Sequence, residues 1–310
     1  MTTHAEHRPP TTVLNRISTL LDAFDGRGPL TLNEVAEYTG FPRSSAHRML
    51  VSLVKLRWVR RDGHRYELGV RLVELGSLAV HQAGLHRVAL PSLHELHRLT
   101  GHVVHLAVLD GPDIVCLEKI GGRLAAAIPT RVGGRLPAHC TALGKALLSS
   151  AHPSELDRVG GPGLTGSTEN SIPSRGRLHR EIAEIRRCGV AYDRQEMVIG
   201  YGCIAAPIRV PGAGASAISV CGPISQICAD PRLADHVRVT ALAIARALTT
   251  RAAATRPDRA ATAGARRRVR PPGRYSGSAA TPDAIDRRPA CPERPRGSGR
   301  PGARHPTGVG

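Results

Sequence analysis

Residues 31–68 read TLNEVAEYTGFPRSSAHRMLVSLVKLRWVRRDGHRYEL, two short helical patterns followed by a hairpin pattern. Thr31 and Glu34 form an S/T-x-x-E capping box, which predicts the start of a helix. Gly40 stands where a helix ends in left-handed backbone, and Pro42 suits the first turn of a second helix. This order of signals predicts a helix-turn-helix.

The second predicted helix has one apolar face and one polar face near its N-terminus. The polar face carries the side-chain types that contact base edges and phosphates when a helix lies in a DNA major groove. The candidate DNA-contacting residues of this helix are Arg43, Ser44, Ser45, His47 and Arg48.

A basic β-hairpin follows, with Asp62-Gly63 as its turn signal. We expect Arg60, Arg61 and Arg65 of this wing to lie along a phosphate backbone. The simpler alternative is a small helical domain with a solvated basic face. A cap, a turn, a half-polar helix and a basic wing in this order favour a winged helix-turn-helix that binds double-stranded DNA, over residues 11–68.

Charge distribution supports the same function without establishing it. The formal net charge is +18, and residues 251–310 carry 14 arginines and 4 acidic residues, a net charge of +10. We expect residues 1–10 to be disordered. The Arg-, Pro-, Gly- and Ala-rich tail, residues 250–310, is also predicted to be disordered, because it has too few apolar side chains to form a core.

Three further observations indicate the cellular location. The sequence has no run of about 18 apolar residues that could cross a membrane, and its N-terminus lacks a signal pattern. The seven cysteines show no CxxC spacing, which favours reduced thiols over a disulfide framework. We therefore expect a cytoplasmic protein without a membrane partner.

After the wing, residues 69–86 show one apolar helical stripe and predict a linker helix, which is also a natural dimerisation element. Residues 87–249 alternate between helical and strand patterns, including a helix over Pro91–Thr100 and an apolar strand over Val103–Leu109. The pattern predicts an α+β domain around an antiparallel sheet, a layout typical of small-molecule sensors.

Over residues 11–249 the chain resembles the IclR family of bacterial transcriptional regulators. The resemblance rests on the segments FPRSSAHRML, YELGVRLVELG, VGGRLPAHCTALGKALL, GVAYDRQEMVIGYGCIAAPI and AISVCGP. It implies an N-terminal winged helix-turn-helix, a linker helix and a C-terminal GAF-like effector-binding domain. It also implies a homodimer or homotetramer that acts on a palindromic operator, as a repressor or an activator, under the control of a small-molecule effector.

The resemblance also implies an effector pocket. The positions that match the family's pocket are Asp193, Cys203, Ser219 and Cys221. Cys221 replaces the serine often seen there. The simpler alternative for the two cysteines is inert filling of apolar strands, which is the common role of a buried thiol.

The residues themselves suggest a carboxylate ligand. Thr141 can cap a helix and leave backbone N–H groups free near Ala142 and Leu143, an arrangement that suits an anion. The resemblance implies a smaller residue at the position of Leu143. Lys145 and Arg135 are candidate contacts, with solvated surface charges as the simpler alternative.

Two other functions remain open. A metal-responsive regulator would use the histidines between His81 and His105, namely His81, His86, His94, His97, His102 and His105. A thiol enzyme would use Cys140, next to His139, or Cys203; adjacent residues on a strand point to opposite faces, however, and no catalytic motif occurs. We expect no catalytic residues, no metal site and no cofactor.

Overall fold

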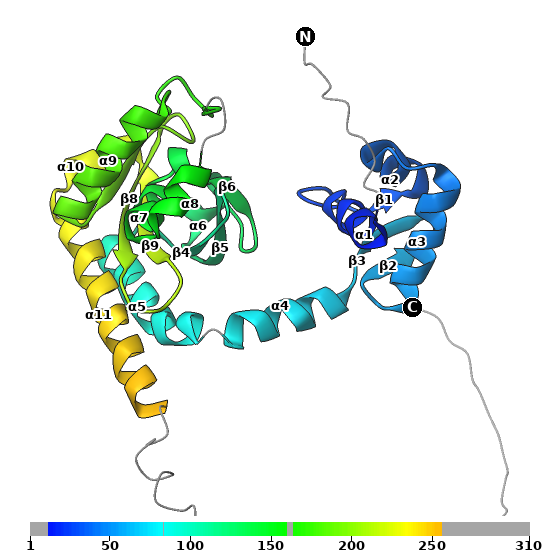
Figure 1. The fold of residues 1–310 in the computed structure, drawn as a ribbon, viewed down its shortest axis with the longest axis horizontal. Helices are drawn as coiled ribbons and strands as arrows, with labels where there is room; N and C mark the ends of the chain where they lie inside the picture. Colours follow the sequence, from blue (N-terminus) through cyan, green and yellow to red (C-terminus); the bar gives the residue numbers. More distant parts are fainter. Residues whose placement is uncertain (1–11, 83, 160–163, 256–310) are drawn as a thin grey trace, which may run out of the picture. The chain divides into compact units, whose positions relative to one another are not determined.

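The computed structural model describes residues 12–82, 84–159 and 164–255. The predicted disorder of residues 1–10, and of the tail beyond residue 255, lies outside these ranges. Figure 1 shows the path of the chain. The N-terminal elements are α1 (Val13–Asp22), β1 (Leu30–Thr31), α2 (Leu32–Thr39), α3 (Arg43–Lys55), β2 (Val59–Asp62) and β3 (Arg65–Leu68).

The helix-turn-helix signals form as the sequence predicts. Thr31 Oγ1 accepts a hydrogen bond from Glu34 N at 3.3 Å, and Glu34 Oε2 accepts one from Thr31 N at 2.6 Å, so the capping box is complete. Gly40 ends α2 with φ +67°, a conformation that costs glycine little. Pro42 is the N-cap of α3.

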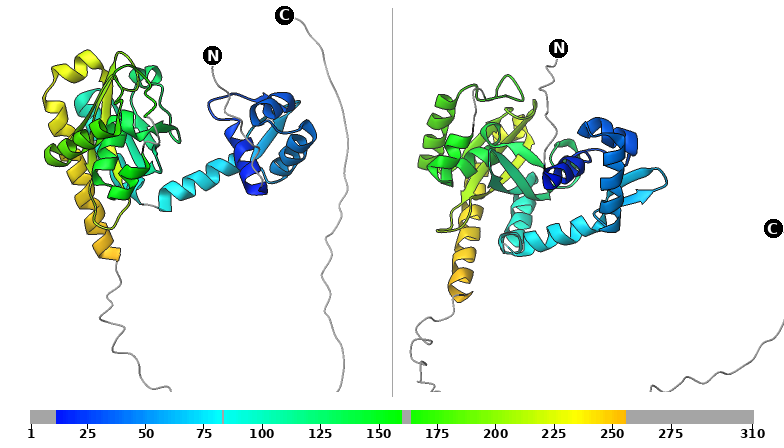
Figure 2. Two further views of the ribbon diagram at one scale, coloured as in Figure 1. Left: turned by 45° about the horizontal axis from the view of Figure 1, so that its top comes forward. Right: turned by 45° about the vertical axis from the view of Figure 1, so that its right-hand side comes forward.

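Burial of one apolar face from each element holds this domain together. Leu20 of α1, Val35 of α2 and Leu50 of α3 are all fully buried in one cluster, to which Tyr66 of β3 also belongs. The three strands form a small antiparallel sheet in the order β1-β3-β2. The β2–β3 hairpin projects from the helices as a wing (Figure 2).

The next helix, α4 (Val70–Gln82), confirms a helix after the wing, and α5 (Leu85–Thr100) follows it. The prediction that a helix starts at Pro91 is wrong, because Pro91 lies inside α5. The helix tolerates this proline because Leu85, Ala89 and Leu93 bury one continuous stripe on both sides of it.

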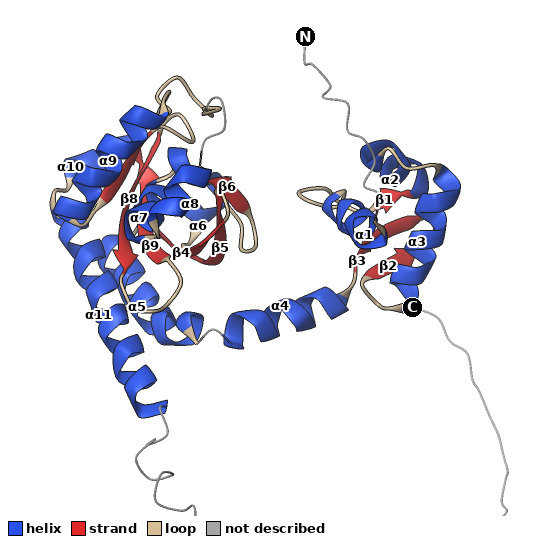
Figure 3. Ribbon diagram, viewed as in Figure 1, coloured by secondary structure: helices blue, strands red, loops and turns tan. Residues whose placement is uncertain are grey.

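A six-stranded antiparallel sheet forms the centre of the C-terminal domain, in the order β6-β5-β4-β9-β8-β7 (Figure 3). Its strands are β4 (Val103–Asp110), β5 (Asp113–Ile120), β6 (Arg135–Pro137), β7 (Ala191–Arg194), β8 (Tyr201–Ile208) and β9 (Ser216–Pro223). The remaining elements are α6 (Arg123–Ala127), the 3-10 turn η1 (Ala138–Cys140), α7 (Ala142–Ser150), α8 (Pro153–Arg158), α9 (Arg175–Cys188), α10 (Ile224–Ala229) and α11 (Arg232–Thr255).

Both faces of the sheet are covered. On β9, Ile218 and Val220 point into a core with α5 and α11, whereas Ala217 packs into a second core with α7 and α9. Alternate side chains of a strand point to opposite faces, so burial on both faces explains why these strands read as nearly continuous apolar runs.

The final helix corrects the predicted start of the disordered tail at residue 250. Helix α11 continues through Thr255, because Arg251 and the three alanines 252–254 favour a helix and the first proline is Pro257. None of the helices in the described ranges has the length and apolarity needed to cross a membrane.

Candidate functional site

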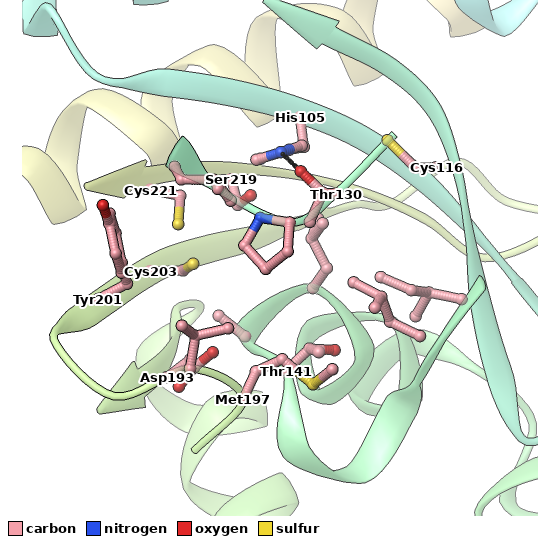
Figure 4. Close-up of a pocket in the computed structure, with 17 residues that line it drawn as sticks. His105, Cys116, Thr130, Thr141, Asp193, Met197, Tyr201, Cys203, Ser219 and Cys221 are labelled. Carbon is pink, nitrogen blue, oxygen red and sulfur yellow. Dashed lines mark hydrogen bonds between the residues drawn. The ribbon is translucent and has the colours of Figure 1, made fainter. Parts of the chain in front are cut away.

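A cavity of about 60 Å³ lies between the sheet and the N-terminus of α7 (Figure 4). A water molecule needs roughly 10–15 Å³, so the space holds several water molecules or one small ligand. All six residues predicted for the pocket line this one cavity: Ala142, Leu143, Asp193, Cys203, Ser219 and Cys221.

The N-terminus of α7 supplies backbone donors. Thr141 Oγ1 caps the helix by accepting from Gly144 N at 3.0 Å, and Thr141 O accepts from Lys145 N at 3.0 Å. Ala142 and Leu143 occupy the first turn, whose N–H groups have no acceptor within the helix. A Cβ on Gly144 would overlap the backbone of Ala138, so a glycine at this position lets η1 and α7 pack closely.

The register of the sheet places the polar side chains in two rows. Asp193 pairs with Cys203, and Cys203 pairs with Cys221, across β7, β8 and β9. In the next row on the same face, Ser219 of β9 pairs with His105 of β4. The sequence segments that supply these residues are far apart, and only the strand order brings them together.

Asp193 is the only acidic residue among the described residues of the cavity wall. Burial raises its pKa to about 6, although Asp193 Oδ1 accepts a hydrogen bond from Glu196 N at 2.7 Å and Lys145 lies nearby. The side chain therefore exchanges a proton near neutral pH.

Sequence reasoning missed the opposite wall, where Ile128, Pro129 and Thr130 line the cavity. His105 Nε2 lies 2.8 Å from Thr130 Oγ1, and Lys119 Nζ donates to the carbonyl oxygens of Ile128 at 2.8 Å and Thr130 at 2.5 Å. Burial lowers the pKa of His105 to about 4, with Lys119 adding to the effect, so the imidazole is neutral at pH 7. One signal in the sequence could have placed His105 in the wall. Alternate residues of a strand share a face, so His105 of β4 lies on the same face of the sheet as Ala107.

Ser219 adds a polar group without a partner. Its side chain is 1% exposed, and its Oγ has no hydrogen-bond partner within the described part of the chain. A buried hydroxyl without a partner costs about 1–3 kcal/mol. A ligand that hydrogen-bonds to Ser219 recovers that energy.

Lys145 lies behind the cavity and outside its wall. Its side chain is fully buried and pairs with Glu181 and Glu196, with Nζ 2.6 Å from Glu196 Oε1. The simpler alternative of a solvated surface charge is therefore wrong for Lys145. It is correct for Arg135, which is exposed and paired with Asp110 and Asp113.

The cavity wall thus combines apolar side chains, a helix N-terminus, the carboxyl group of Asp193 and the buried, unpartnered hydroxyl group of Ser219. No lysine or arginine occurs among the residues that line it in the described part of the chain. An anionic ligand would depend on backbone N–H groups instead of a side-chain cation.

The thiol-enzyme and metal alternatives receive no structural support. Burial raises the pKa of the Cys140 thiol, and His139 Nε2 faces Thr165 O at 3.2 Å. The predicted histidine group is dispersed: His86 bonds to Glu118, and His97 bonds to the backbone of residue 102. Among the described side chains, which do not include that of His81, no group of three metal-binding residues occurs.

The predicted DNA-contacting face of α3 is open. Arg43, Ser44, His47 and Arg48 are exposed, and Ser45 is partly buried. Ala46, Leu50 and Leu53 of α3 point the other way, into the domain core. Within the described ranges, the guanidinium groups of Arg43 and Arg48 have no hydrogen-bond or ion-pair partner, so both are available to a ligand.

The wing arginines are exposed but already have protein partners. Arg60 pairs with Glu67, its cross-strand neighbour. Arg61 donates to Gly63 O at 2.8 Å, and Arg65 donates to Pro29 O at 2.8 Å. These bonds hold the guanidinium groups on the surface of the wing.

Two family models match the chain. The model described as bacterial transcriptional regulator IclR C-terminal matches residues 77–246, and the IclR helix-turn-helix domain matches residues 13–63. The chain is 34% identical to the HTH-type transcriptional regulator XynR of Escherichia coli over 63% of this chain and 79% of that protein. It is 30% identical to the HTH-type transcriptional regulator KipR of Bacillus subtilis over 73% of this chain and 93% of that protein.

Solved structures agree. An IclR homologue from Microbacterium hydrocarbonoxydans, complexed with 4-hydroxybenzoate, superposes with a TM-score of 0.69 and 27% identity, over 77% of this chain and all of that chain. The IclR protein of Thermotoga maritima superposes with a TM-score of 0.61 and 27% identity, over 76% of this chain and 98% of that chain. These relatives are transcriptional regulators, and the family is not known to be enzymatic. With its helix-turn-helix and its effector-binding domain both matched, the chain belongs to the IclR family of DNA-binding transcriptional regulators.

Proposed function

We propose that this regulator binds a palindromic operator as a homodimer or homotetramer in the cytoplasm, and that a small carboxylate in the cavity changes its affinity for that operator. The observation that carries the effector assignment is the first turn of α7, which opens into a mostly apolar cavity whose described lining residues include no lysine or arginine. The relative complexed with 4-hydroxybenzoate binds a carboxylate, which supports the same class of ligand here.

In this mechanism, α3 enters the major groove and the wing lies on the phosphate backbone. Arg43, Ser44, Ser45, His47 and Arg48 are the proposed groove contacts, and Arg60, Arg61 and Arg65 are the proposed backbone contacts. The effector acts by population shift: it binds one quaternary arrangement better and so changes the spacing of the two DNA-reading helices. Whether the bound form represses or activates depends on the position of the operator.

Arg48→Ala and Arg61→Ala separate base reading from backbone contact. We expect Arg48→Ala to weaken binding to the operator by about 1–3 kcal/mol, because a groove contact discriminates between bases. Arg61→Ala weakens binding to all DNA alike. It also reduces the slope of the logarithm of the binding constant against the logarithm of the salt concentration by about one. Fluorescence anisotropy on the DNA upstream of the gene and on shuffled DNA, across a salt series, measures both. Equal losses on the two DNAs for Arg48→Ala would exclude it from base reading.

The proposed dimer rests on apolar side chains that α4 leaves uncovered. Val70, Val73 and Leu78 are 61%, 69% and 56% exposed, an unusual stripe for a helix in water. A second copy of the chain would bury this stripe and would place two copies of α3 for two half-sites.

Val73→Asp tests this interface. We expect the variant to lose the dimer at micromolar concentration, because a carboxylate would be buried in an apolar contact. Val239→Asp on α11 is the matched control, since Val239 is 62% exposed on a different helix. Analytical ultracentrifugation measures the mass of each variant. An unchanged mass for Val73→Asp places the dimer interface elsewhere.

A further inference from the structure

Two thiols face each other in the cavity wall. Cys203 of β8 and Cys221 of β9 are direct partners in the antiparallel register, and both line the cavity (Figure 4). Cys221 belongs to a small buried cluster with Val103 and Ile128, and Cys203 packs against this cluster. The third thiol of the wall, Cys116, pairs with Ala107 instead and donates to Glu118 O at 3.3 Å.

The backbone geometry permits a bond between Cys203 and Cys221. Directly opposed residues of antiparallel strands have Cα atoms about 4.5–5.5 Å apart, and a disulfide accepts Cα separations of about 4.4–6.8 Å. The adjacent pair in the register is Gly202 and Gly222. Because neither residue has a side chain, no steric contact at this pair prevents the two strands from moving slightly closer, as an S–S bond requires.

The two thiols differ in access. Cys221 is 3% exposed, whereas Cys203 is only partly buried and faces the space that a small molecule enters. The neighbouring Cys221 thiol and burial both raise the pKa of Cys203. The reactive thiolate is therefore a minor species at neutral pH, and its reactions accelerate as the pH rises.

We propose that Cys203 and Cys221 form a redox-active dithiol, which a hydroperoxide small enough to enter the cavity converts into a cross-strand disulfide. The Cys203 thiolate attacks the outer peroxide oxygen, the O–O bond breaks, and the alcohol or water leaves with the proton that Cys203 released. The Cys221 sulfur then attacks the Cys203 sulfenic acid; its S–O bond breaks and water leaves. In sum, two thiols and one hydroperoxide give one disulfide, one alcohol or water, and one water.

The disulfide changes the effector cavity. It removes two S–H groups from the wall and ties together two members of the Asp193–Cys203–Cys221 row. Oxidation therefore lowers the affinity for a small acid, and operator binding becomes less responsive to that acid. This consequence rests on the proposed function, whereas formation of the bond does not.

The test oxidises the full reduced chain with hydrogen peroxide at pH 7 and pH 8.5. Remaining thiols are blocked with N-ethylmaleimide, and the digested protein is analysed by mass spectrometry. We expect a peptide pair joined through Cys203 and Cys221, two hydrogens lighter than the reduced pair. It forms roughly thirtyfold faster at pH 8.5, because the thiolate fraction of a thiol with a raised pKa grows tenfold per pH unit. Cys116→Ser, the matched control in the same wall, keeps the link, and Cys221→Ser loses it. A wild-type chain with Cys203 and Cys221 still reduced, or linked only to other cysteines, overturns the proposal.

A second arm titrates 4-hydroxybenzoate, benzoate and pyruvate as probes into the reduced and oxidised protein on the upstream DNA. At least a tenfold weaker response after oxidation, absent in Cys221→Ser, supports the consequence. An unchanged response in fully linked protein overturns it. If the reduced protein does not bind that DNA selectively, the proposed function fails, and the mass measurement still decides the disulfide.

Discussion

Lys145→Met is expected to lower the free energy of unfolding by about 3–5 kcal/mol, because it removes one partner from a buried ion pair and leaves the carboxylates uncompensated. The methionine retains most of the aliphatic volume, so the loss reports the missing ammonium group. Lys145 is fully buried, whereas its partners Glu181 and Glu196 have side chains 25% and 7% exposed. Glu196 Oε2 has no hydrogen-bond partner in the described residues, which increases its dependence on Lys145.

The same substitution is expected to disturb the cavity, since Glu196 N donates to Asp193. Denaturant unfolding of the full chain, followed by circular dichroism, measures the stability change. Arg187→Ala is the control because it breaks an exposed ion pair with Glu184 on α9, and such pairs contribute little. Equal and small effects of the two variants would show that Lys145 does not stabilise the domain.

Asp193→Asn is expected to change how stability depends on pH. The pKa of Asp193 is raised to about 6 by burial, above its ordinary value of 3.8, so folding favours the protonated form. The associated stability is present below pH 4 and is lost as the pH rises through 6. At 1.36 kcal/mol per pKa unit, the loss by pH 8 is about 3 kcal/mol. The asparagine variant keeps this stability up to pH 8, because its side chain does not ionise and can still accept the hydrogen bond from Glu196 N.

The measurement is the difference in unfolding free energy between wild type and Asp193→Asn from pH 4 to pH 8. Taking the difference cancels groups common to both proteins, including His105, whose lowered pKa acts in the opposite direction. The same proton controls the effector: an ionised Asp193 repels a carboxylate, so wild-type affinity for an acid falls above pH 6 while that of the variant stays constant. A difference in stability that does not vary with pH would mean that folding does not raise the pKa of Asp193.

Local patterns predicted much of the fold. The capping box at Thr31, the glycine at position 40 and the hairpin signal at Asp62-Gly63 act through neighbouring residues. The capping box and the glycine form as predicted, whereas the hairpin turns one residue later, at Gly63 and His64, because Asp62 still pairs with Arg65. The start of α5 depends instead on packing. Pro91 usually marks a helix start, but burial of Leu85 and Ala89 extends the helix in front of it.

The cavity could be predicted only in part. Ala142, Leu143, Asp193, Cys203, Ser219 and Cys221 were found through family resemblance and the cap at Thr141, and all line the cavity. The wall around Thr130 was missed, because a short irregular segment after α6 carries no periodic signal. Lys145 was misjudged because burial of a lysine depends on its carboxylate partners, and Glu181 and Glu196 lie far from it in the sequence.

The central claim is that occupation of the cavity by a small acid controls operator binding. The most direct test is fluorescence anisotropy of the full chain on the DNA upstream of its own gene, against shuffled DNA, with a panel of aliphatic and aromatic carboxylates. The account predicts selective binding that at least one acid shifts, with a shift that Asp193→Asn alters. Binding that is equal on both DNAs, or selective binding that no acid shifts in wild type, would contradict it.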